Sequence, residues 1–197
     1  LHGVVIDAEV EAGAGYLEQG LSFARRAGDR WTIGGALTNL GEVARIRREY
    51  DRAAAYYSEA LTIQRELDDR HDAAVTLQNL GCIASQQGAY AQARALFLDS
   101  LHLYQSLGRK RGLCDCLAGF GGLAVEQGQL DRAVRLLAAA QTHVQLLDLQ
   151  FDPADRADFE RDVAVAREQL DPIVFTAAWA AGEALTLEEA IGLAARE

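Results

Sequence analysis

The stretch Leu77-Gln-Asn-Leu-Gly-Cys-Ile-Ala84 decides the fold, because the chain repeats its pattern at a fixed distance. Forty residues earlier the sequence reads Leu37-Thr-Asn-Leu-Gly-Glu-Val-Ala44, and forty residues later it reads Leu117-Ala-Gly-Phe-Gly-Gly-Leu-Ala124. Within each copy small or apolar residues recur at i, i+3, i+4 and i+7, which is the spacing of one face of an α-helix. A fixed period of this length predicts a solenoid of stacked helical repeats.

A second helical pattern follows each copy and carries a large side chain at a matching phase. These large residues are Tyr57, Phe97 and Leu137. The first pattern carries a mid-helix glycine at the corresponding positions, Gly41, Gly81 and Gly121. Glycine in a helix interior costs about 1 kcal/mol relative to alanine. Because this cost recurs at one phase, we expect the paired helices to approach closely there, with the large side chain filling the space beside the glycine.

The repeat pattern covers the first 150 residues and is lost beyond them. We expect a half repeat that lacks its first helix and then three full repeats, at 5–30, about 31–70, 71–110 and 111–150. The remainder contains both prolines, each after an aspartate that can cap a helix, and a capping box at Thr186. The sequence therefore predicts an all-α fold: a right-handed superhelical solenoid of antiparallel helix pairs over 1–150, closed by C-terminal capping helices over 151–197.

The half repeat at the start has a consequence for association. An internal repeat cut in this way exposes an apolar face that a neighbouring repeat would cover. The chain begins at Leu1 and contains no methionine, so we interpret it as a fragment or a processed form. We expect the truncated N-terminal edge to pair with a second copy, and we expect this homodimer to be a product of the truncation that the preceding repeat would abolish.

Charge and composition exclude several classes of partner. Of the net charge of −10, residues from Asp148 onward contribute −8, with 12 acids against 4 bases. The sequence has no Lys and Arg cluster of the kind that a nucleic-acid-binding surface requires, so we expect no direct nucleic-acid binding. The acidic stretch is either a solvated face that aids solubility or a docking site for a basic partner. No apolar run approaches the roughly 20 residues that span a bilayer, and three cysteines make no disulfide framework. These features favour a cytoplasmic protein that does not enter a membrane.

The repeated landmarks resemble the tetratricopeptide repeat in its 40-residue form, over about residues 10–147. The stretch Gly128–Ala140 and the ending Phe175–Ile191 are similar to the C-terminal repeat region of bacterial signalling ATPases, including LuxR-type transcriptional regulators. The chain contains no Gly-x4-Gly-Lys-Ser/Thr phosphate loop and no basic recognition helix. The resemblance therefore implies a sensing or scaffold module of a bacterial regulator, without the parent's ATPase or DNA-binding activity.

In tetratricopeptide arrays the first helix of each repeat lines a concave groove, so the resemblance also implies which side chains face that groove. In the first two full repeats they are Thr38, Asn39, Glu42, Arg45, Gln78, Asn79, Cys82 and Gln86, and the third adds Asp115, Gly119, Gly122 and Glu126. Asn39 and Asn79 share one phase. A carboxamide donates and accepts at once, which suits an extended peptide backbone. The alternative is that these asparagines bond neighbouring helices or water. Arg45 either takes a ligand carboxylate or pairs with Glu42 on the surface, and we favour the exposed pair.

No set of residues supports catalysis, a cofactor or a metal. Cys114 and Cys116 point about 200° apart on a helix, so we expect them to be buried as small apolar groups, and we expect Trp31 and Trp179 to pack in the interior. The acids over 152–162 have helical spacing, unlike a calcium loop. We predict a non-catalytic protein- or peptide-binding module, or one that senses a small effector. The alternative is a structural scaffold that mediates self-association or inter-domain spacing, with an empty groove.

Overall fold

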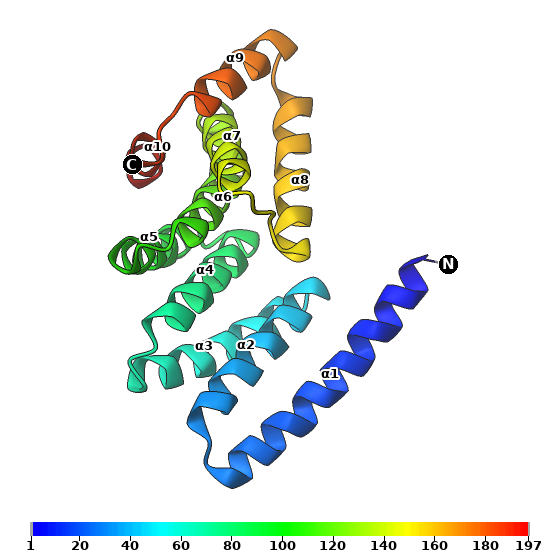
Figure 1. Ribbon diagram of the computed structural model, residues 1–197. Helices are drawn as coiled ribbons and strands as arrows, with labels where there is room; N and C mark the ends of the chain where they lie inside the picture. The colour runs from blue at the N-terminus through cyan, green and yellow to red at the C-terminus, as the bar shows by residue number, and fades with distance from the viewer. Residues whose placement is uncertain (1, 197) are drawn as a thin grey trace.

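The computed structural model describes residues 2–196, with side chains from residue 13 onward, and this part of the chain is helical with no strand. Consecutive helices pack as antiparallel pairs that stack into a curved array (Figure 1). The predicted all-α solenoid of helix pairs is confirmed. The helices are α1 (His2–Ala27), α2 (Arg30–Ile46), α3 (Tyr50–Glu66), α4 (Arg70–Gln86), α5 (Tyr90–Leu107), α6 (Lys110–Glu126), α7 (Leu130–Leu146), α8 (Pro153–Gln169), α9 (Pro172–Glu183) and α10 (Leu187–Ala195).

One residue in the left-handed backbone conformation follows each of the helices α1 to α7, and these residues recur every twenty positions. Four of them are glycines with φ between +64° and +75°, Gly28, Gly88, Gly108 and Gly128. The others are Arg48, Asp68 and Asp148, with φ between +54° and +59°. A left-handed residue at the end of a helix reverses the chain and lets the next amides bond the last carbonyls. The regular turn therefore produces the antiparallel pairs.

The expected fit of a large side chain against a mid-helix glycine is confirmed in all three full repeats. A Cβ atom on Gly81 would lie 2.7 Å from Cε1 of Phe97. The equivalent distances are 2.6 Å from Gly41 to Tyr57 and 2.7 Å from Gly121 to Leu137. Tyr57, Phe97 and Leu137 are fully buried. The glycine thus allows the two helices of a repeat to pack with an aromatic or leucine side chain between them.

The three C-terminal helices attach to different parts of the array. The two helices α9 and α10 pack on α7, and α10 also contacts α6. The carboxylate of Asp171 caps α9 by accepting from the Ile173 amide at 2.8 Å, and Thr186 forms the predicted capping box with Glu189. By contrast, α8 packs on α6 and α7 and stands across the open side of the array, with its first turns directed toward α2 (Figure 1).

Two expectations about single residues have different outcomes. Cys114 and Cys116 are buried, as expected. Trp31 was expected to pack in the interior, and this is wrong, because it is 70% exposed near the start of α2. Trp179 does pack, since its ring stacks on Phe175 with 5.7 Å between centroids.

We predict that Gly81→Leu lowers the free energy of unfolding by roughly 1–3 kcal/mol, because the new side chain overlaps Phe97. Gly35→Leu is the matched control, since Gly35 also lies inside a helix but has no atom within 4 Å of its added Cβ. Urea unfolding of both variants and the parent measures the difference. If the two variants lose equal stability, the close packing at Gly81 does not hold.

Candidate functional site

The inner face of the array is formed by α2, α4 and α6, the first helices of the three full repeats, and α8 lies against one part of it. The eight side chains predicted for the groove in the first two full repeats belong to α2 and α4, and the four predicted in the third belong to α6. The position of α8 divides the eight on α2 and α4 into two groups. One group lines an open cleft, and the other lies beside or beneath α8.

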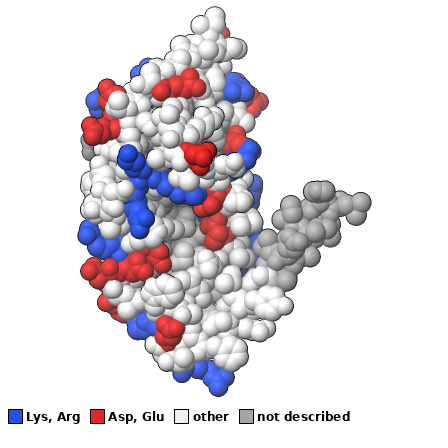
Figure 2. All heavy atoms as spheres, in the orientation of Figure 1, with Lys and Arg blue, Asp and Glu red and all other residues white. Residues whose placement is uncertain are grey.

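The open cleft has a volume of about 940 Å³ and lies between α2, α4, the start of α6 and the first turn of α8. Figure 2 shows this face of the molecule, with basic and acidic side chains gathered on opposite sides of a hollow near its middle. Five of the predicted residues line the cleft: Thr38, Asn39, Glu42, Gln78 and Asn79. The structure therefore brings the polar residues of two repeats to one concavity.

Two amides in this cleft are buried and have no partner within the protein. Gln78 is 6% exposed and Asn79 is 7% exposed. Among the residues that the structure describes, neither side chain makes a hydrogen bond, and both line the cleft. The side chains are largely covered, but their amide atoms are not fully buried, so these amides are available to a ligand or to water. Asn39 lies beside them on α2 and is exposed.

Two other predicted residues of the cleft are already engaged. The Thr38 hydroxyl donates to the carbonyl of Gly34 and accepts from the Gln64 amide, both at 3.1 Å. The Glu42 carboxylate binds Arg45 on the next turn of α2. These two side chains thus stabilise the repeat, and the amides are the groups left to contact a ligand.

A cationic wall closes one side of the cleft, at the turn between α5 and α6. It consists of Arg109, Lys110 and Arg111. Arg111 pairs with Asp152 of the α8 turn at 2.9 Å and with Asp115 at 3.6 Å. Arg109 and Lys110 are exposed and have no ion pair among the described residues. Positive charge therefore remains available at the edge of the cleft.

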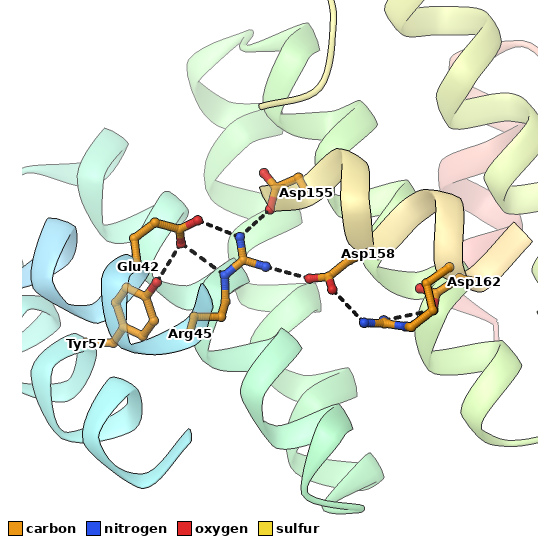
Figure 3. A network of polar contacts seen from close by, with 7 residues as sticks. Glu42, Arg45, Tyr57, Asp155, Asp158 and Asp162 are labelled. Atoms are coloured by element: carbon orange, nitrogen blue, oxygen red, sulfur yellow. Dashed lines mark hydrogen bonds and ion pairs between the residues drawn. The ribbon is translucent and has the colours of Figure 1, made fainter. Parts of the chain in front are cut away.

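Beside the cleft, Arg45 joins α2 to α8 (Figure 3). Its Nη1 donates to Asp158 at 2.6 Å and its Nη2 donates to Asp155 at 2.9 Å. Its Nε and Nη2 also donate to Glu42, at 3.0 and 2.7 Å. The Tyr57 hydroxyl donates to the same carboxylate at 2.9 Å. One guanidinium thus connects the first full repeat to a helix more than 100 residues later.

This network corrects one expectation and changes another. The pair of Arg45 with Glu42 exists, but the prediction that it is an exposed pair is wrong, because Arg45 is only 7% exposed. Burial opposes the charge of Arg45, but Glu42 and Asp155 outweigh it, so its pKa is raised. The acidic stretch is neither wholly solvated nor wholly free for a basic partner, since Asp155 and Asp158 bind the chain's own arginine.

The remaining predicted residues, Cys82 and Gln86, lie on the part of α4 that faces α8. Cys82 is partly covered, and burial raises the pKa of its thiol. Gly122 on α6 lets the carboxylate of Asp162 approach closely, because an added Cβ would overlap that carboxylate in its present position. Sequence reasoning did not assign α8 to the groove. The i, i+3 spacing of Asp155 and Asp158 places both on one face of a helix, and this spacing was the available signal.

Asp115 lies where the cleft meets α8, and its carboxyl group is largely buried. Burial, reinforced by the negative charge of Asp155, raises its pKa from 3.8 to about 7, although Arg111 opposes the shift. Burial also raises the pKa of Asp162 to about 6, against the effect of Arg161. Protonation of this acidic cluster near neutral pH therefore depends on how closely α8 packs.

Comparison with known families supports the assignment of the repeats. Residues 32–106 match the family model of the tetratricopeptide repeat, which is less than half of the chain and corresponds to α2 through most of α5. No curated protein matches the chain. Tetratricopeptide repeats generally mediate protein–protein interaction and are typically non-catalytic. The matched segment contains the amides of the open cleft.

Within residues 2–196, no helix is both long enough and apolar enough to cross a membrane. The same part of the chain contains no group of three or more His, Cys, Asp or Glu side chains that could hold a metal ion.

We predict that Asp115→Asn reduces the dependence of stability on pH. Because the folded-state pKa is raised, the folded protein binds more protons than the unfolded chain between about pH 4 and pH 7, and stability falls as pH rises through this window. The parent should lose roughly 1–3 kcal/mol relative to the variant between about pH 5 and pH 8, with a slope of at most about 1.4 kcal/mol per pH unit. Urea unfolding at several pH values measures this. If the free energies of unfolding of the parent and the variant differ by the same amount at every pH, this prediction is wrong.

Proposed function

We propose that this chain is a non-catalytic repeat module that binds a segment of a protein or a peptide in the open cleft. The observation that carries this proposal is the pair of buried amides, Gln78 and Asn79, which face the cleft without a partner in the protein. Their amide atoms reach the solvent of the cleft, so they can bond water when no ligand is present. A ligand that displaces this water has to bond both groups in its place, because a ligand without donors and acceptors would leave them unpaired.

The arrangement suits an extended backbone. Each residue of such a segment offers one N–H and one C=O, and a carboxamide can bond either of them. Asn39 on α2 and Asn79 on α4 stand at equivalent positions of neighbouring repeats. Arg109 and Lys110, at the edge of the cleft, favour a segment that carries carboxylates or another anion. A small polar effector with the same groups would use the same cleft.

The wider context that we propose is a bacterial cytoplasmic signalling or transcriptional regulator. It is supported by the resemblance of Gly128–Ala140 and Phe175–Ile191 to the repeat regions of such proteins. The cleft is bounded by α2, α4, α6 and α8, so a ligand contacts the first full repeat and the C-terminal helices at once. A ligand that binds one arrangement of these helices more tightly would shift the chain toward it. Ligand occupancy would in this way couple the first full repeat to the C-terminal helices.

A second candidate function is a scaffold that self-associates through its N-terminal edge. Three aromatic side chains on α1 and α2 favour it, since Tyr16, Phe23 and Trp31 are 75%, 65% and 70% exposed. Large exposed apolar groups close together in the sequence can mark an interface. The predicted homodimer would cover them. In this case the mass of the particle would depend on concentration, and substitutions in the cleft would not change it.

We predict that Asn39→Ala/Asn79→Ala binds peptides selected by the parent roughly tenfold more weakly, because two hydrogen bonds to the backbone are lost. The probe is a displayed library of linear peptides, selected on the parent and measured on each variant by fluorescence anisotropy. Gln127→Ala/Gln169→Ala is the matched control, since it removes two exposed amides at helix ends away from the cleft.

The control should bind as the parent does. Equal affinity of all three proteins for the selected peptides, or the absence of any selected peptide, would favour the scaffold instead. Circular dichroism establishes that the double variant remains folded.

A further inference from the structure

We propose that the part of the groove beneath α8 is a binding site for an acidic amphipathic helix of a partner protein. In this structure the chain's own α8 occupies the site, and the partner helix replaces it. The site lies beside the open cleft and does not depend on a ligand there. Its elements are Arg45 on α2, the exposed end of α4 at Cys82 and Gln86, and the small residues of α6.

The contacts of α8 define what the site recognises. Two aspartates one turn apart, Asp155 and Asp158, share the guanidinium of Arg45. The next residue, Phe159, is buried and stacks on Phe151 with 5.0 Å between ring centroids. Asp162, one turn further, lies against Gly122, where an added Cβ would displace its carboxylate. The recognised pattern is therefore Asp-x-x-Asp-Phe-x-x-Asp on one face of a helix.

The contact of α8 with the array is small and only partly apolar, which makes replacement feasible: Phe159 and Ala166 pack in the core, and the acids form ion pairs. The buried residues of α8 are Phe159, Asp162 and Ala166, whereas α7 buries eight residues, all of them apolar. The attraction within a buried ion pair is largely offset by the desolvation of its charges, so such pairs add little net stability. Consistent with that desolvation, burial raises the pKa of Asp155 and Asp162. A second helix with the same acids could therefore compete with α8 on nearly equal terms.

The rest of the C-terminal region is anchored without α8. Gly182 of α9 packs against the backbone of Arg135 on α7. The last carbonyls of α10 accept from Arg132, including Arg196 O at 2.7 Å, and from Arg94, which binds Ala195 O at 2.6 Å. Extended residues precede and follow α8. The helix can thus leave the groove while α9 and α10 remain in place.

The experiment uses a capped, fluorescently labelled synthetic peptide of residues 151–171 as the probe. In Asp155→Asn/Asp158→Asn the chain's own helix loses its hold on Arg45, so the peptide should bind at least about tenfold more tightly than it binds the parent, since affinity scales with the fraction of open sites. Glu160→Gln/Glu168→Gln is the matched control. It removes the same charge from exposed positions of α8 and should bind as the parent does. Adding Arg45→Gln to the first variant should abolish binding.

A second measurement uses the parent alone and does not require a folded variant. A saturating amount of the peptide should increase amide hydrogen exchange in α8 and leave α9 unchanged. The proposal is overturned if the peptide binds the parent and the Asp155/Asp158 variant equally, if it binds neither, or if α8 keeps its protection when the peptide is present. None of these outcomes bears on the open cleft, because the cleft amides are tested separately.

Discussion

The guanidinium of Arg45 is the group on which the arrangement of the groove depends. Arg45 lies on the first full repeat, yet two of its three carboxylate partners come from α8, which follows the third full repeat in the chain. Without it, no described ion pair or hydrogen bond would hold α8 to the first full repeat. The open cleft would lose its wall at Asp152–Asp155, and the inner face of α4 near Cys82 would become accessible. The partition of the groove into an open and an occupied part therefore depends on this buried cation together with the packing of α8 on α6 and α7.

This interaction is possible only because the repeats bring distant residues together. The left-handed turns reverse the chain every twenty residues, and Gly41, Gly81 and Gly121 let each helix pair close on a large side chain. The inner helices are thereby placed side by side. The Tyr57 that fills the space at Gly41 also donates its hydroxyl to Glu42. Packing within a repeat and orientation of the cation at its surface are thus achieved by the same side chain.

The sequence was sufficient to predict the helices, because every copy of the period carries its own local signals. A residue in the left-handed conformation, often glycine, follows each repeat helix. Asp171 caps the start of α9, and Thr186 caps the start of α10. The docking of α8 could not be predicted in this way. The acidic face is visible in the sequence, but the cation that meets it lies 110 residues earlier, and no local pattern identifies it. The residues that contact a ligand stay a prediction, although the structure shows which amides are available.

The most direct test of this account is a double-mutant cycle between Arg45→Met and Asp155→Asn/Asp158→Asn, measured by urea unfolding. If Arg45 holds α8 to the first full repeat, the two changes are not additive, and the coupling energy should be about 1–3 kcal/mol. The combined variant would then be little less stable than the worse of its two parents. Losses that add to within about 0.5 kcal/mol would show that the two helices are not coupled through this cation, and would contradict the account.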